Sequence, residues 1–247
     1  MARERHLKNA PIREAVIDIK IVPPVSLELL TSYAESLRKD FPEQEELRQS
    51  TLGIEFGENQ MKASRVDNAP HGLRLISEDP KYIVQLKCDG FTFSSLPPYE
   101  SWETIEKKAR VLWDGYVAKS QAEKVTRVAV RYINMIELPL PTGELKEYLS
   151  APPEIPEDLP QELSGFFSRI VIVNKQIDAI ALVTQALEPS SENKAQVILD
   201  IDVFRENKEV AWAAGDPHVW DTLNQLKKFE DQIFFQSLTE KTVEMFE

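Results

Sequence analysis

The sequence predicts an α+β protein in which an antiparallel sheet packs against two long helices that carry tryptophan. Three observations lead to this class. Several short segments alternate apolar with polar residues, which is the pattern of half-buried strands. Two longer segments, 102–119 and 217–235, contain tryptophan and repeat apolar residues at helical spacing. The strand segments after residue 165 follow one another through short links, which favours antiparallel pairing.

Residues 14–22, EAVIDIKIV, are predicted to form the first strand, because alanine and isoleucines alternate there with valine and charged residues. Pro23 and Pro24 end this strand, since proline cannot continue a ladder of backbone hydrogen bonds. Ser26 is suited to cap the helix that follows, and Pro42 lies just past its end. The apolar stripe of that helix comprises Leu27, Leu30, Ala34 and Leu37.

The region from residue 51 to residue 94 is predicted to consist of strands. Its first part contains three short strands, TLGIEFG, QMKASRV and HGLRLISED. The turns between them are expected at Gly53, Gly57, Asn59 and Asn68-Ala69-Pro70. The second part, KYIVQLKCDGFTFS, reads as one stronger strand with a kink or bulge at Gly90. One face of this strand carries Tyr82, Val84, Leu86 and Cys88.

A helix and a strand are predicted in the centre of the chain. Pro97 and Pro98 separate the helix from the preceding strand. The helix buries the stripe Trp102, Ile105, Ala109, Leu112, Trp113 and Tyr116. The strand VTRVAVRYINMIEL follows at 125–138. One of its faces carries Val128, Val130 and Tyr132, and the other carries Arg127, Ala129 and Arg131.

A proline-rich connector at 151–162 is predicted to join an N-terminal α+β half, 1–150, to a C-terminal half, 163–247. GELKEYL, just before the connector, is expected to form a short helix. The C-terminal half contains three predicted strands, SRIVIVNKQ, DAIALVTQAL and AQVILDIDVF, and a helix that Asp216 caps. Ser237 and Glu240 are expected to form the capping box of a last short helix. Both halves place a tryptophan-bearing helix after an apolar strand and a loop, which fits either an old duplication or the general pattern of α+β proteins.

The composition disfavours several classes of function. A net charge of -12 disfavours a dedicated nucleic-acid binder, because neutralising phosphates supplies most of that affinity. The chain contains only 8 glycines, and they do not form a glycine-rich phosphate-binding loop. The N-terminal residues have no apolar run and no segment has the length of a membrane span, so we expect a cytoplasmic protein that does not contact membranes.

The residues that commonly bind metals are sparse. The single cysteine, Cys88, excludes an internal disulfide or a cysteine-based zinc site, and we expect it to be inert packing. No two of the histidines His6, His71 and His218 have the spacing of metal ligands. We therefore predict no bound metal and no cofactor, except under the enzyme hypothesis below.

Three stretches carry a resemblance to known proteins. They are the N-terminal NAPIREAVIDIKI, the central FTFSSLPPYESWETIEKKARVLWDGY with TRVAVRYIN, and the closing FFQSLTEKTVEMF. Together they resemble a sporadically distributed family of uncharacterised prokaryotic proteins, over most of the chain. The resemblance implies a patchy distribution of the kind seen for laterally exchanged genes, and it implies no reaction, cofactor or catalytic residue.

Asp200 and Asp202 in LDIDVF are the first candidates for chemistry. Two carboxylates two residues apart on a strand share one face and lie about 7 Å apart. Such a pair can hold Mg²⁺ for phosphoryl or nucleotidyl transfer, although a third carboxylate and a phosphate loop usually accompany it. The alternative is a solvent-facing strand whose aspartates pair with Arg127, Arg131 or Lys20.

Arg127 and Arg131 share a strand face and could grip a carboxylate or phosphate ligand, because the guanidinium fork offers paired donors. The alternative is a pair of structural ion pairs in an acidic protein. Asn134 could form a turn or present its amide to a ligand. A pocket between sheet and helix, lined by Trp113, Tyr116 and Arg131, would be a further ligand site.

We expect a non-enzymatic binding protein whose partner is another protein or a second copy of the chain. A link to a mobile defence or toxin system is an association drawn from the patchy distribution alone. This hypothesis predicts an exposed apolar patch, which we expect in the closing segment IFFQSLTEKTVEMF. The alternative is a metal-dependent phosphoryl or nucleotidyl transferase centred on Asp200 and Asp202, which predicts three convergent acids in a cleft.

Overall fold

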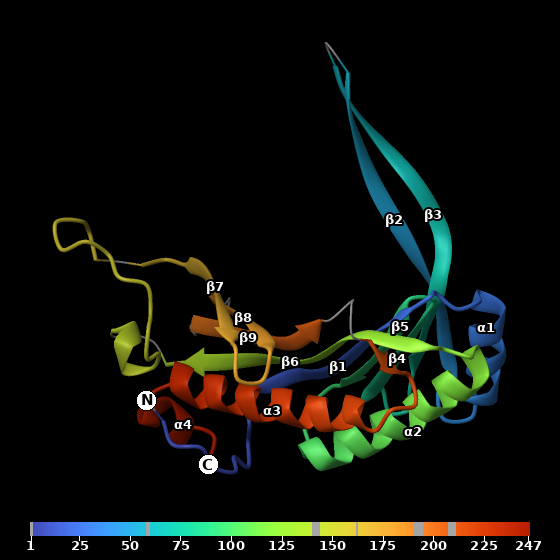
Figure 1. Cartoon of the computed structure of the whole chain (residues 1–247). Helices are drawn as coiled ribbons and strands as arrows, with labels where there is room; N and C mark the ends of the chain where they lie inside the picture. The colour runs from blue at the N-terminus through green and yellow to red at the C-terminus, as the bar shows by residue number, and fades with distance from the viewer. Residues whose placement is uncertain (1, 58–59, 140–143, 162, 190–194, 207–210) are drawn as a thin grey trace.

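The structure is a computed structural model that describes residues 2–57, 60–139, 144–161, 163–189, 195–206 and 211–247. They form an α+β fold with one large antiparallel sheet (Figure 1). Its strands are β1 (Ile12–Val22), β2 (Glu43–Gly57), β3 (Gln60–Ile76), β4 (Tyr82–Lys87), β5 (Gly90–Ser95), β6 (Lys124–Leu138), β7 (Phe166–Asn174), β8 (Ala179–Pro189), β9 (Ala195–Glu206) and β10 (Trp212–Ala213). The helices are α1 (Leu27–Ser36), α2 (Trp102–Ser120), η1 (Leu145–Glu147), a 3₁₀ turn, α3 (His218–Ser237) and α4 (Glu240–Glu244).

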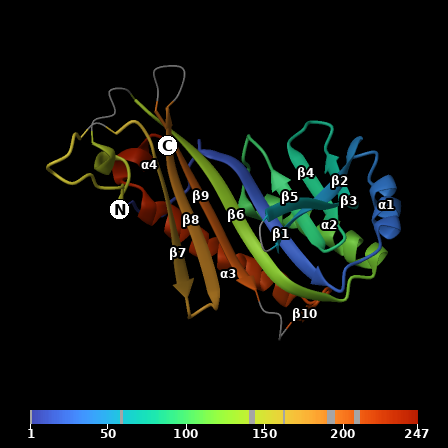
Figure 2. The ribbon, with the colours of Figure 1, turned by 90° about the horizontal axis from the view of Figure 1, so that it is seen from above.

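The strand order is β2-β3-β4-β5-β1-β6-β9-β8-β7, and the short β10 pairs with β6. The first strand of the chain therefore lies in the middle of the sheet, between β5 and β6 (Figure 2). Its Ile17 lies opposite Phe93 of β5 and Val130 of β6, and all three side chains are buried. β9 pairs with β6, so strands from both sides of the connector share this sheet. No helix in the described ranges is long and apolar enough to cross a membrane.

The predicted short strands between residues 51 and 79 are wrong, because the chain there forms one long hairpin of β2 and β3. Figure 1 shows this hairpin projecting from the face of the sheet opposite the helices. Gly53 and Pro70 lie within strands, whereas Asn59 lies outside the described residues. Pro70 is tolerated because β4 pairs with β3 only from Gly72 onward and the register of the hairpin shifts beside Pro70.

The expected kink at Gly90 is also wrong, because the chain reverses there. Cys88 and Asp89 form a two-residue turn, and Lys87 of β4 pairs with Gly90 of β5. A Cβ atom on residue 90 would lie 2.3 Å from the carbonyl oxygen of Ile19, so the close approach of β1 requires glycine.

The predictions for the first two helices are confirmed. The Ser26 hydroxyl accepts a hydrogen bond from the backbone N–H of Glu28, and the Ser101 hydroxyl accepts one from Thr104. The predicted stripe of α2 faces the core, with Trp113 and Tyr116 fully buried. Trp113 donates to the carbonyl of Ala214, and the Tyr116 hydroxyl donates to the carbonyl of Lys87. These two candidate ligand residues therefore belong to the core.

The C-terminal strands β7, β8 and β9 form the predicted antiparallel meander. Two expectations about the end of the chain are wrong. Thr239 caps α4, because Ser237 is still the last residue of α3. The closing segment is not an exposed apolar patch, because it packs into the core under the sheet. Its buried apolar side chains are Ile233, Phe234, Phe235, Leu238 and Val243.

Candidate functional site on the open face of the sheet

The sheet has one covered and one open face. Helices α2 and α3 lie along one face (Figure 1), and no helix of the described ranges covers the other. On β9 the residues alternate accordingly, since Leu199 and Ile201 are buried while Asp200 and Asp202 are partly exposed. Four of the residues predicted to carry chemistry lie on this open face, namely Arg127, Arg131, Asp200 and Asp202.

Asp18 is the centre of a row of ion pairs on the open face. Its carboxylate accepts hydrogen bonds from Lys87 Nζ at 2.9 Å, from the Thr92 hydroxyl at 2.8 Å and from Arg127 Nη1 at 2.9 Å. Burial would raise the pKa of Asp18, but Lys87, Thr92 and Arg127 together hold it below its usual value. Asp18 is therefore ionised and fully paired, with donors from β4, β5 and β6.

Arg127 continues this row toward β9. Its Nη2 lies 3.4 Å from Asp202 Oδ2, and its guanidinium lies 4.5 Å from the ring centre of Phe204. Burial raises the pKa of Asp202, because the charges of Arg127 and Arg131 offset it only in part. Asp202 is thus the more weakly paired carboxylate of the row.

Arg131 and Asp200 form a separate two-fold ion pair. Nε and Nη2 of Arg131 lie 2.8 and 2.7 Å from the two oxygens of Asp200. This hydrogen-bonded carboxylate raises the pKa of the Arg131 guanidinium. The fork that could hold a ligand anion therefore holds a carboxylate of the protein itself.

These contacts disfavour a Mg²⁺ site at Asp200 and Asp202. Arg131 contacts both oxygens of Asp200 and Arg127 contacts Oδ2 of Asp202, so a cation would compete with a guanidinium at each carboxylate. Among the described residues, no group of three acidic, histidine or cysteine side chains could hold a metal ion. The hollow beside Asp18 and Asp202 measures about 260 Å³, below the range of roughly 300–1,000 Å³ typical of ligand pockets.

The other candidate residues lie apart from this face. Trp113 and Tyr116 are buried beneath the sheet, whereas Arg131 is exposed above it. These three side chains therefore do not line a common pocket. Asn134 is buried on the helix side of β6, where its Nδ2 donates to the carbonyl of Leu199.

The edge strand β7 is the second feature of the open face. Eight large hydrophobic side chains of the described residues are exposed, and half of them lie on this strand of nine residues. On the open face the exposed fractions are 69% for Phe167, 61% for Val171 and 62% for Val173, and Ile170, on the other face of the strand, is 54% exposed. Val171 lies opposite Leu182 of β8, so the apolar surface continues onto the next strand. Contiguous exposed apolar surface of this kind is uncommon on monomeric soluble proteins.

The backbone of β7 is also available for pairing. The strand pairs with β8 without any register shift, and no strand of the described ranges lies on its other side. It contains no proline, and its one charged residue, Arg169, donates to the Thr184 hydroxyl at 3.0 Å. The opposite edge of the sheet, β2, begins instead with a charged segment that contains Glu43, Glu45, Glu46 and Arg48. Charged edge strands resist pairing with other chains, and β7 lacks this protection.

The sequence alone did not single out β7. Its apolar run FFSRIVIVN is the pattern of a strand buried on both faces, which normally predicts a central position in a sheet. The mismatch between that pattern and the edge position becomes visible only when the strand order is known.

No family model matches the chain, and no curated protein matches it. The resemblance carried by residues 91–116 and the two flanking stretches therefore stays a prediction. Function has to be inferred from the surfaces that the fold presents.

Proposed function

We propose that the protein is a non-enzymatic interaction protein that binds a partner chain along β7. The observation that carries this proposal is an unprotected edge strand of nine residues in which Phe167, Ile170, Val171 and Val173 are exposed apolar side chains. In strand addition, the free backbone N–H and C=O groups pair with an extended segment of the partner. Side chains at alternate positions then supply specificity and bury apolar area.

A second copy of the chain is the partner that the chemistry of β7 fits best. Antiparallel pairing of two copies centred on Ile170 would place Phe167 of each copy opposite Val173 of the other. Pairs of an aromatic and a β-branched residue stabilise antiparallel strands by about 0.2–1 kcal/mol each. In this register Arg169 faces Val171 of the other copy, so no like charges meet. Nothing on β7 therefore keeps two copies apart.

The test is a double substitution in β7, Val171→Lys with Val173→Lys. Val111→Lys on α2 is the matched control. Val111 is exposed to a similar extent, at 67%, and α2 packs against β5, which is far from β7 in the strand order. Light scattering during size-exclusion chromatography should show a dimer for the wild type and for Val111→Lys. The β7 variant should be a monomer with an unchanged circular dichroism spectrum.

Two results would contradict this assignment. A wild-type chain that is monomeric at all concentrations would exclude the second copy and leave a different protein as the partner. A dimer that survives the β7 substitutions would place the interface elsewhere, since Val171→Lys puts a positive charge opposite Arg169 of the other copy and Val173→Lys puts one opposite Phe167.

A further inference from the structure

Arg169 lies among the exposed apolar residues of β7 without a carboxylate partner. Its Nε donates to the Thr184 hydroxyl at 3.0 Å, and its guanidinium lies 5.7 Å from the ring centre of Phe167. Among the described residues, no carboxylate forms an ion pair with it. The remaining N–H donors of the guanidinium fork are therefore free to bind a carboxylate from another chain.

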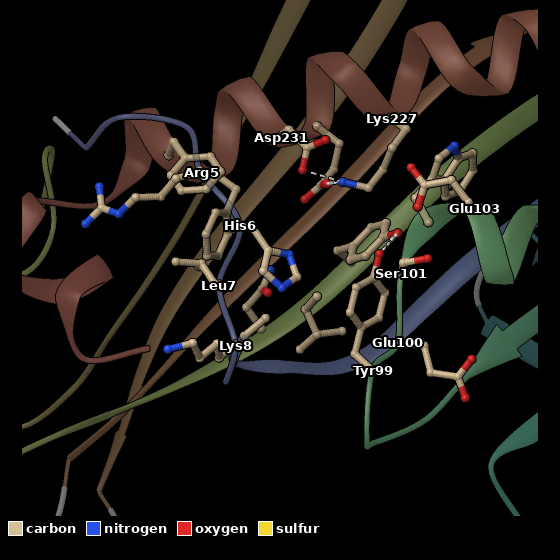
Figure 3. Close-up of a pocket in the computed structure, with 18 of the residues that line it drawn as sticks. Arg5, His6, Leu7, Lys8, Tyr99, Glu100, Ser101, Glu103, Lys227 and Asp231 are labelled. Atoms are coloured by element: carbon tan, nitrogen blue, oxygen red, sulfur yellow. Dashed lines mark hydrogen bonds and ion pairs between the residues drawn. The ribbon is translucent and has the colours of Figure 1, made fainter. Parts of the chain in front are cut away.

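The buried charges of α3, on the covered side of the sheet, are instead paired within the chain. Figure 3 shows Lys227 and Asp231 on the wall of a cavity of about 640 Å³. Lys227 Nζ donates to Asp231 and, at 3.0 Å, to Glu230. The other charged residues of the lining have both signs, namely Arg5, Lys8, Lys228, Glu100 and Glu103. The cavity therefore does not discriminate by charge, whereas β7 presents a single positive charge.

The proline-rich connector carries negative charge next to β7. Figure 2 shows the connector beyond the free edge of β7, on the side that a partner strand would occupy. Glu157 and Asp158 are exposed, and neither has an ion-pair partner in the described ranges. The neighbouring Leu159 is 54% exposed. The hydrogen bonds of residues 151–161 join only Pro156, Leu159 and Gln161 to one another, so none of them ties the connector to the sheet.

Pairing of two copies along β7 would bring these opposite charges within reach of each other. In the antiparallel register centred on Ile170, Phe166 of one copy lies opposite Asn174 of the other. Asn174 is five residues from Arg169, or about 17 Å along the strand. Asp158 precedes Phe166 by eight residues, which can span roughly 26 Å. The connector of one copy is therefore long enough to reach Arg169 of the other.

The paired strands would also favour negative charge at this place. The register puts the two Arg169 side chains at diagonal positions on one face, roughly 7–8 Å apart. A carboxylate that contacts one guanidinium would then lie close to both. Leu159 of the same connector would cover Val171 and Val173 of the other copy and remove apolar surface from water.

We propose that, in the dimer formed along β7, the connector of each copy lies on the open face of the other copy. Its Glu157 and Asp158 pair with Arg169 of that copy, and its Leu159 packs beside them on the apolar residues of β7. This inference rests on the proposed pairing of β7 and adds a reciprocal second contact to it. The site is incomplete in a single chain, because the guanidinium and the carboxylates come from different copies.

Charge reversal on each side of the contact tests the proposal. Sedimentation equilibrium of the full chain should show the dimer weakened about tenfold by Glu157→Lys with Asp158→Lys, and separately by Arg169→Glu, because symmetry places each substitution at two contacts. Asp40→Lys with Glu78→Lys is the matched control for net charge. Both control residues are exposed and lie beside α1 and β4, far from β7 in the strand order, so the dissociation constant should not change.

Mixing the two weakened variants distinguishes a contact between copies from a contact within one chain. In a mixed dimer, the two lysines of one connector face the introduced glutamate of the other copy, and the native connector faces the native Arg169. The mixture should therefore dimerise with about the wild-type affinity, although each variant alone dimerises weakly. A contact within one chain would leave like charges together in both copies, and the mixture would stay as weak as its components.

Three results would overturn the proposal. A mixture that is as weak as the separate variants would place the contact within one chain. Reversed variants with unchanged affinity would exclude the connector contact alone, if Val171→Lys with Val173→Lys still gives a monomer. A wild-type chain that is monomeric at all concentrations would exclude the β7 dimer and the connector contact with it. The connector substitutions lie in an exposed segment and keep the test valid if Arg169→Glu does not fold.

Discussion

The carboxyl group of Glu230 is buried beside Lys227 and Asp231 on α3. Burial raises its pKa from 4.5 to about 7, because the charge of Lys227 offsets the loss of water only in part. The folded protein therefore holds a proton on this group more tightly than the unfolded chain does. It follows that folding and protonation of Glu230 are linked.

We predict that Glu230→Gln removes a pH dependence of stability. Because the folded pKa is raised, the wild type is favoured below pH 4.5, loses stability as the pH rises to about 7 and changes little above that. The loss is on the order of 3 kcal/mol, from about two and a half pKa units at 1.36 kcal/mol each. Urea unfolding of both proteins between pH 5 and pH 8 measures it. The stability of the wild type relative to Glu230→Gln should fall with pH, and parallel curves would contradict this.

At the residue scale, the sequence predicted the charged residues on the open face of the sheet, but it did not predict the buried charged group around Lys227 and Glu230. Alternation along 125–138 and 195–204 placed Arg127, Arg131, Asp200 and Asp202 on strand faces, and the structure joins them across β6 and β9. Asp18 could not be placed there, because its proximity depends on the strand order. The burial of Lys227 and Glu230 was not predicted, because two opposite charges three residues apart on a helix are typical of an ordinary surface pair.

At the scale of elements, Gly115 controls how α1 packs on α2. The Tyr33 hydroxyl of α1 donates to the carbonyl of Leu112 at 2.8 Å, which lays the tyrosine ring across α2. A Cβ atom on residue 115 would lie 2.3 Å from the Tyr33 hydroxyl oxygen and 2.7 Å from the ring carbon that carries it. The contact between the two helices therefore depends on the missing side chain.

We predict that Gly115→Ala destabilises the protein. Alanine is favoured over glycine within a helix by about 1 kcal/mol, so propensity alone predicts the opposite sign. The clash with the buried Tyr33 should outweigh this gain and cost about 1–3 kcal/mol. Gly215→Ala is the control, because a Cβ atom there meets nothing within 4 Å. Thermal unfolding should show a lower midpoint for Gly115→Ala alone, and a raised midpoint would refute the packing argument.

Local signals predicted some elements and not others. The stripe from Ile105 to Tyr116 and the prolines before it define α2 within one stretch of chain. The prediction of a bulge in place of the turn at Cys88 and Asp89 overlooked a change of phase, because the buried apolar residues are Val84 and Leu86 before the turn and Phe91 and Phe93 after it. The sequence predicted turns at Gly53 and Pro70, within the β2–β3 hairpin. Glycine and proline are tolerated inside these strands because only one neighbouring strand pairs there, and the residues themselves do not indicate this.

At the scale of the whole molecule, strands from both sides of the proline-rich connector belong to one sheet. β6 and β9 pair through twelve residues, from Arg127 with Glu206 to Leu138 with Ala195. α3 packs on both strands, so the core does not divide at residues 151–162. Whether the two halves arose by duplication stays a prediction, but their folding is expected to be joint.

We predict that cutting the connector does not separate the two parts. A site for a sequence-specific protease inserted between Glu157 and Asp158, both exposed, allows a single cut. The two fragments should elute together in size-exclusion chromatography and unfold in one thermal transition, because the β6–β9 ladder and the core hold them. Fragments that separate, or two distinct transitions before cutting, would instead indicate independent domains.

The central place of β1 has a consequence for synthesis of the chain. β1 leaves the ribosome before β5 and β6 have been translated, and β6 ends only at Leu138. Ile17, Ile19 and Ile21, all buried in the finished sheet, lack both neighbouring strands until β5 has been made, and they lack β6 until Leu138 has been made. Exposed apolar strands of incomplete chains are prone to aggregate. The nascent chain is therefore expected to recruit a chaperone at its first strand and to release it only after β6 has been made.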